Sequence, residues 1–221
     1  MRTRYFFSKF LFIPPLIALI TNIGASFFTR FIGGRTVDIA TVVDDKIPFV
    51  PEFIYIYILA YIQWVVCIIA VMISDEYVGR RYCFAISVAN IISGIFFLVM
   101  PTVAYIRPEE FTGGGTVTEF LGNFIYAADN PPQNAFPSIH CLHSWGCMRM
   151  LFALKSAPRS IKIINATVSF LVFASVVFVK QHFFIDIPAG ILVFELGLFI
   201  TKYTQLDQGA VRVETKLFLH S

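Results

Sequence analysis

Charge is what this sequence lacks most. Only 14% of its 221 residues are Asp, Glu, Lys or Arg, whereas a soluble domain typically carries about 25%. Hydrophobic residues make up 57% of the chain and gather in long uninterrupted runs. This composition excludes an ordinary soluble domain, and we predict an integral membrane protein. The net charge of +3 is modest, and we expect no nucleic-acid partner.

Two other absences narrow the function. The four cysteines lie in or at the edges of hydrophobic runs, and no pair has the spacing of a disulfide framework, so we expect small apolar packing residues. Three consecutive glycines, residues 113–115, lack the Gly-Lys-Ser/Thr ending of a Walker phosphate loop. They predict a flexible segment in the loop 106–137, which could cover a site.

The hydrophobic runs set the architecture. A membrane span needs about 20 apolar residues to cross about 30 Å of hydrocarbon. The connections between runs are short, so we predict one all-α domain over residues 1–221 with six transmembrane helices. The first run follows Arg2, Arg4 and Lys9 like a secretory signal, but no soluble domain follows it, so we expect a retained span. The six runs are residues 11–29, 53–74, 83–105, 138–154, 163–179 and 183–201.

The distribution of charge predicts the orientation. With a cytoplasmic N-terminus and six spans, 12 of the 17 basic residues fall on the cytoplasmic side. The other side receives five basic residues and nine acidic ones. The positive-inside rule therefore predicts that both termini are cytoplasmic. We expect a site at the extracytoplasmic face and a location in the plasma membrane.

Two polar motifs stand where predicted spans meet water. Residues 134–140 read Asn-Ala-Phe-Pro-Ser-Ile-His, and residues 175–186 end in a histidine and, one helical turn later, an aspartate. A histidine held by a carboxylate can attack phosphorus, and a second histidine can protonate the leaving oxygen. Helix starts also attract anions. The pair His140 and His182, with Asp186, therefore predicts phosphate chemistry.

These motifs resemble those of a known family. Pro137-Ser138-Ile139-His140 is similar to P-S-x-H, and residues 175–186 are similar to S-R-x5-H-x3-D. Arg107-Pro108 resembles the end of K-x6-R-P. Together they resemble, over about residues 53–203, the membrane-bound branch of the type 2 phosphatidic acid phosphatase and haloperoxidase superfamily.

The resemblance implies a role for each matching residue. His182 would be the nucleophile that forms a phosphohistidine, and Asp186 would orient it. His140 would protonate the departing oxygen and then activate water. Ser138 and Arg107 would bind phosphoryl oxygens. The family needs neither a metal nor a cofactor, so we expect none.

The sequence also departs from the family pattern. Met100 stands where the first motif has lysine, and Val176 stands where the third has arginine. We expect Lys180, two residues before His182, to supply one missing cation as a phosphate-binding residue. The reduced set is similar to that of the sphingolipid head-group phosphotransferases, which keep His, His and Asp.

The sequence thus predicts a lipid phosphatase that hydrolyses a phosphomonoester or pyrophosphate of a membrane lipid. Two alternatives stay open: a lipid head-group phosphotransferase with the same triad, and a catalytically inactive protein that binds lipid phosphate. We expect His143 to be structural rather than part of a metal set, and mid-span Glu195 to be protonated or to have a buried partner. For Asn134 the sequence leaves two roles open: orienting the loop or contacting phosphate. The oligomeric state is left open.

Overall fold

The computed structural model describes residues 20, 23 and 36–209. The predicted span 11–29 lies outside the described residues except for two positions. The described part is all-α, with two isolated β-bridges. Its elements are η1 (Asp44–Lys46), η2 (Pro51–Phe53), α2 (Ile54–Ser74), α3 (Glu76–Val99), α4 (Thr116–Ala128), α5 (Ile139–Ala153), α6 (Arg159–Phe178) and α7 (Asp186–Thr204).

Four helices of the described chain are long and apolar enough to cross a membrane, which makes this an integral membrane protein. They comprise residues 51–74, 76–99, 159–178 and 186–204. The expectation of an all-α membrane fold is therefore confirmed. The number of six spans and their orientation remain predictions.

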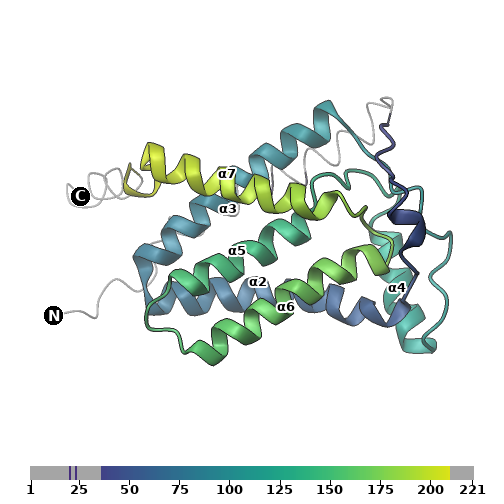
Figure 1. The fold of residues 1–221 in the computed structure, drawn as a ribbon, viewed down its shortest axis with the longest axis horizontal. Coiled ribbons are helices and arrows are strands. Elements are labelled where there is room, and N and C mark those ends of the chain that lie inside the picture. Colours follow the sequence, from purple (N-terminus) through teal and green to yellow (C-terminus); the bar gives the residue numbers. More distant parts are fainter. Residues whose placement is uncertain (1–19, 21–22, 24–35, 210–221) are drawn as a thin grey trace.

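The helix α5 forms the centre of the bundle. It contacts α2, α3, α6 and α7, and the five helices run side by side in Figure 1, with α4 lying across one end. Only the last two residues of α5 are exposed. Because its neighbours enclose it, this helix of 15 residues can carry polar side chains along its length.

Two glycines bring α7 against its neighbours at backbone distance. A Cβ on Gly190 would lie 2.4 Å from the Ser138 carbonyl oxygen, just before α5. A Cβ on Gly197 would lie 2.6 Å from the Ala85 carbonyl oxygen in α3. The first contact fixes the spacing between the two segments that carry the predicted site.

The helix α3 begins and ends earlier than the hydrophobic run 83–105 predicted. It begins at residue 76 because the Asp75 side chain caps it, accepting hydrogen bonds from the amides of Tyr77 (3.1 Å) and Val78 (3.2 Å). It ends at Val99 because Pro101 has no amide hydrogen to continue the ladder. Beyond it, Thr102 and Val103 form bridges to Val37 and Gln133.

The loop 106–137 is not a simple flexible segment, because it contains α4. All three glycines of 113–115 have positive φ, between 78° and 94°, and α4 begins directly after them. One face of α4 packs against the core through Leu121, Ile125 and Tyr126. This buried face anchors the helix over the end of the bundle, which sequence reasoning missed.

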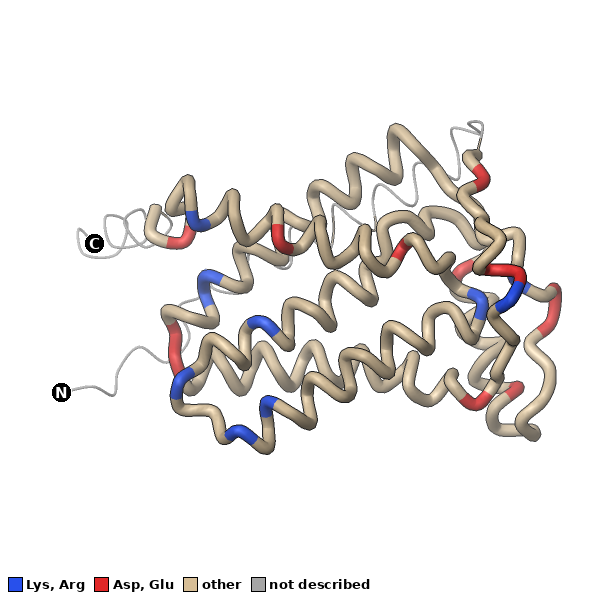
Figure 2. The backbone as a smooth tube through the Cα atoms, viewed as in Figure 1, with Lys and Arg blue, Asp and Glu red and all other residues tan. Residues whose placement is uncertain are grey.

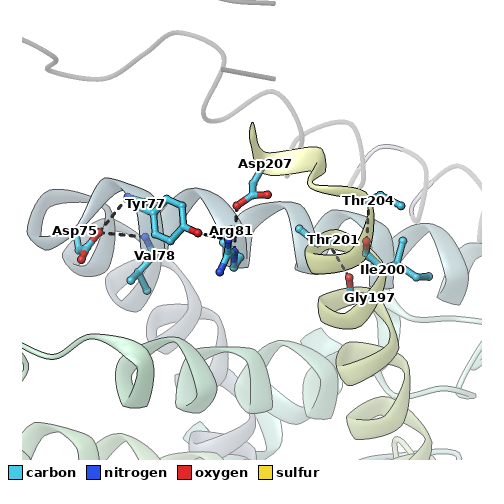
Figure 3. A network of polar contacts seen from close by, with 9 residues as sticks. All are labelled: Asp75, Tyr77, Val78, Arg81, Gly197, Ile200, Thr201, Thr204 and Asp207. Atoms are coloured by element: carbon cyan, nitrogen blue, oxygen red, sulfur yellow. Dashed lines mark hydrogen bonds and ion pairs between the residues drawn. The ribbon is translucent and has the colours of Figure 1, made fainter. Parts of the chain in front are cut away.

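Charges separate between the two ends of the bundle. Figure 2 shows basic residues outnumbering acidic ones at the end holding the α2–α3 turn and the α5–α6 connection, and the reverse at the end holding α4. At the basic end, Arg81 in α3 binds Asp207 beyond α7 through Nε and Oδ2 at 3.1 Å (Figure 3). The predicted site residues belong to the acidic end.

Candidate active site

The two histidines of the motifs meet at the acidic end of the bundle. His140 lies in the first turn of α5, and His182 lies in the turn between α6 and α7. Their ring centroids are 5.7 Å apart with the planes inclined at 64°. Both line one cavity of about 260 Å³, together with Tyr57 and Tyr61 of α2. This arrangement allows the two rings to act on one phosphoryl group.

The His182 ring is held by two acceptors on the same nitrogen. Nδ1 lies 2.8 Å from the Ala135 carbonyl oxygen and 3.2 Å from Asp186 Oδ2. Because both partners accept, the hydrogen belongs on Nδ1, which leaves Nε2 with a free lone pair. Asp186 is itself fixed, since its Oδ2 also accepts a bond from the Phe183 amide at 2.9 Å. The turn thus holds His182 in the tautomer that a nucleophile needs.

The His140 ring is held mainly by aromatic neighbours. Its Nε2 lies 3.1 Å from the Tyr61 hydroxyl, and the Tyr57 ring packs on it with centroids 4.3 Å apart. The Trp64 ring lies 5.2 Å away, centroid to centroid. Within the described part of the chain, its buried Nδ1 has no hydrogen-bond partner.

Ser138 caps α5, as its position before the helix allows. Its Oγ accepts a hydrogen bond from the Cys141 amide at 3.3 Å, and the side chain is fully buried. It is not among the residues that line the cavity. The contribution that its geometry shows is therefore to fix the start of α5, and with it His140.

Arg107 does not join the histidines. Its guanidinium donates to the carbonyl oxygens of Tyr126 and Asp129, the latter at 3.0 Å, and lies 3.9 Å above the Tyr126 ring centroid. It lines a neighbouring cavity of about 410 Å³, which shares Pro132 with the cavity of the histidines. Burial lowers the pKa of Arg107, and the nearby Asp129 carboxylate opposes that shift.

Lys180 also points away from the cavity. Its ammonium group donates to the carbonyl oxygens of Ile47 at 2.6 Å and Asp44 at 3.1 Å. Burial lowers the pKa of Lys180, while the carboxylates of Asp44 and Asp45 act against this shift. Its backbone is left-handed, with φ of 55°. Lys180 therefore joins the turn before His182 to residues 44–47 rather than replacing a cation of the family motifs within the cavity.

Sequence reasoning missed two side chains that hold the site loops. The fully buried Asp44 accepts bonds from the Thr41 amide at 2.8 Å and from the Phe184 amide at 2.6 Å. The Thr102 hydroxyl accepts from the Phe136 amide at 3.0 Å, and its carbonyl accepts from the Asn134 amide at 2.8 Å. Neither residue stands at a specified position of a motif, so the sequence held no local signal for them.

The two remaining candidates have structural partners. His143 Nε2 lies 2.9 Å from Asn90 Oδ1 of α3, as expected for a structural histidine. Glu195 accepts from Trp145 Nε1 at 2.7 Å and pairs with Arg149 Nε at 2.7 Å. Glu195 therefore has partners, but they are half-buried rather than buried as expected, and Glu195 does not line the histidine cavity.

The chain belongs to the PAP2 superfamily. The family profile described as "PAP2 superfamily" matches residues 39–200, which include Arg107, His140, His182 and Asp186. Comparison with curated proteins and with solved structures finds no match. The family resemblance drawn from the three motifs is confirmed, and with it the class: a membrane protein of phosphatase type.

Proposed function

We propose that this protein hydrolyses a phosphomonoester or pyrophosphate of a membrane lipid through a phosphohistidine intermediate. The observation that carries the proposal is the fixed pair of rings in one cavity. His182 Nδ1 is bound by two acceptors, so Nε2 is free, and the His140 ring centroid lies 5.7 Å from that of His182. No step in the proposal uses a metal or a cofactor.

The reaction runs in two displacements. His182 Nε2 attacks phosphorus, the bond to the leaving oxygen breaks, and His140 gives that oxygen a proton. His140, now neutral, then takes a proton from water as the water oxygen attacks phosphorus, and the nitrogen–phosphorus bond breaks to release phosphate. Asp186 stabilises the positive charge that the His182 ring acquires. Transfer of this kind depends on positioning and charge neutralisation.

The position of the cavity supports a lipid substrate. Tyr61 lines the cavity and is 42% exposed on α2, where Ile62, Val65 and Val66 are also exposed. A head group in the cavity therefore leaves its tail beside an apolar helix surface within the bilayer. From the positive-inside rule, the cavity opens at the extracytoplasmic face.

Three residues expected to bind phosphate receive different roles. Ser138 positions His140 by capping α5. Arg107 braces α4 through Tyr126 and Asp129, and Lys180 braces the turn before His182. The proposal gives none of the three a contact with the phosphoryl group in the arrangement described.

The test is phosphate release by purified protein from a panel containing phosphatidic acid, phosphatidylglycerol phosphate and undecaprenyl pyrophosphate. We expect His182→Asn to lower the rate by about a thousandfold or more, since it removes the nucleophile. Glu76→Gln, at the opposite end of the bundle, serves as the control. Equal rates for His182→Asn and the wild type would reject the assignment.

Two further arms separate the alternatives. A labelled donor lipid supplied with an acceptor lipid would give a new labelled lipid if the protein were a transferase. Vanadate binding without turnover of any lipid would identify an inactive binder. Activity that a chelator removes and a divalent ion restores would overturn the metal-free mechanism.

A further inference from the structure

Two amide side chains in the histidine cavity have polar atoms that nothing in the described structure satisfies. Asn134 is 8% exposed and Gln181 is 4% exposed, and both line the cavity. Among the described residues, the side-chain nitrogens of both, and the side-chain oxygen of Asn134, have no hydrogen-bond partner. A buried unsatisfied NH₂ group is costly, and native proteins keep few of them. Two in one cavity indicate a ligand that accepts hydrogen bonds.

The backbone of each amide residue is tied to the element that positions a histidine. Asn134 directly precedes Ala135, whose carbonyl holds His182, and its own amide donates to the Thr102 carbonyl at 2.8 Å. Gln181 directly precedes His182, and its amide donates to the Val176 carbonyl at 3.0 Å. The main chain is therefore fixed at both positions.

The left-handed backbone of Asn134 supports the same interpretation. Its φ is 63°, a conformation that asparagine tolerates better than most residues. Asparagine in this conformation often bonds its own neighbouring backbone, but here no described residue partners either polar atom of the side chain. The Asn134 side chain therefore makes no hydrogen bond within the described turn and is available to a ligand.

We propose that the NH₂ groups of Asn134 and Gln181 bind the non-bridging oxygens of the phosphoryl group that His182 attacks. This inference rests on the proposed function and names a phosphate-binding pair in which neither residue stands at a specified position of the family motifs. Fixed neutral donors stabilise the charge that develops on these oxygens during transfer. The ligand they fit is a tetrahedral oxyanion, which inorganic vanadate or phosphate can represent.

At Asn134 the assignment does not depend on how the amide is flipped, whereas at Gln181 it uses the orientation in which Nε2 is the atom without a partner among the described residues. Within the described part of the chain Asn134 lacks a partner on both polar atoms, so either orientation of its amide presents a donor to the cavity. A phosphoryl group also offers several equivalent acceptor oxygens. Two donors beside His182 and His140 therefore suffice to orient it for attack.

The experiment measures binding separately from turnover. Orthovanadate binding to the purified full chain is followed by calorimetry and by the vanadate-induced rise in the thermal unfolding midpoint. Asn134→Asp and Gln181→Glu keep the side-chain size but replace the donor by an acceptor. We expect the vanadate Kd to rise at least tenfold in each, and the KM for a lipid phosphate to rise with it.

Gln205→Glu, an exposed residue at the other end of the bundle, is the matched control, and we expect it to bind vanadate as the wild type does. Gln181→Met and Asn134→Gly remove the donors without adding charge and serve if a carboxylate variant fails to fold. We expect both to weaken vanadate binding as well.

Wild-type affinity for vanadate in both donor-free variants, or no vanadate binding by the wild type, would overturn the inference. A third outcome is that the wild type binds vanadate yet releases no phosphate from any lipid, while the donor-free variants lose vanadate binding. That outcome would reject the proposed hydrolysis but support the amide site.

Discussion

The two ends of the bundle use charged side chains in different ways. At the acidic end, which holds the candidate site, Asp44, Arg107 and Lys180 bind main-chain amides or carbonyls of segments distant in sequence. At the other end, Arg80 pairs with Glu76, and Arg81 pairs with Asp207. Charges bound to the main chain hold loops in their conformation, whereas the ion pairs join side chains of residues that already lie on helices.

This difference predicts where substitutions act. A buried charge bound to the backbone holds a loop in place, so its loss moves whatever that loop carries. An exposed ion pair such as Arg80–Glu76 contributes only about 0–1 kcal/mol, because water and salt screen it. Substitutions of charged residues at the acidic end should therefore lower the catalytic rate. Substitutions at the basic end should change only the free energy of unfolding.

The largest effect is expected from the buried carboxylate beside His182. Asp186→Asn removes the charge that stabilises the positive His182 ring of the phosphohistidine and should lower kcat by about a thousandfold. Asp207→Asn, an equally buried carboxylate at the other end, should change kcat less than about twofold, since it lies far from the chemistry. Steady-state phosphate release measures both, and similar losses in the two variants would show that buried carboxylates at the two ends do not differ in their effect on catalysis.

The next largest effect concerns helix spacing. Gly190→Ala places a methyl group against the Ser138 carbonyl and should push α7 away from the start of α5. A displacement of about 1 Å between catalytic groups can cost about a hundredfold in rate. Gly209→Ala, where a Cβ would meet nothing within 4 Å, is the control. Full activity in Gly190→Ala would show that the spacing tolerates change.

A smaller effect is expected at Asp44. Asp44→Asn replaces charged acceptors for the Thr41 and Phe184 amides by weaker ones. Loss of roughly 1.4 kcal/mol in the hydrogen bonds that hold the His182 turn corresponds to about a tenfold fall in kcat. The adjacent, exposed Asp45→Asn should keep its activity. Equal kcat for the two variants would show that Asp44 does not position the turn.

The smallest effect is expected from the exposed ion pair. Glu76→Gln removes one charged partner of Arg80 and should alter the free energy of unfolding by less than about 1 kcal/mol. Phosphate release should stay within about twofold of the wild type. A tenfold loss would mean that side chains at the basic end also affect catalysis at the acidic end.

The sequence predicted the elements that local patterns determine. The bounds of α2, α5, α6 and α7 lie within a few residues of the hydrophobic runs, because continuous apolar stretches are themselves the signal for a span. The meeting of His140 and His182 was also predicted, since each motif occurs at the start of a helix or close to it. These features depend on residues that are neighbours in the chain.

The features that were missed depend on distant contacts. Lys180 binds carbonyls more than 130 residues away, and Arg107 binds residues about 20 positions away, so no local pattern revealed where either cation points. The helix α4 escaped notice because three glycines precede it and suggested a flexible loop. The early end of α3 at Val99 was obscured by the apolar residues that continue past Pro101.

The Ala135 carbonyl bound to His182 has an evolutionary consequence. A main-chain oxygen is present whatever side chain the codon specifies, so half of the restraint on the His182 ring cannot be deleted by a single missense change. Descendants of this gene that alter Asp186 would keep an imidazole aimed in the ancestral direction. Lineages could therefore vary the charge behind the ring, and with it the reaction, while the aim of the ring is inherited.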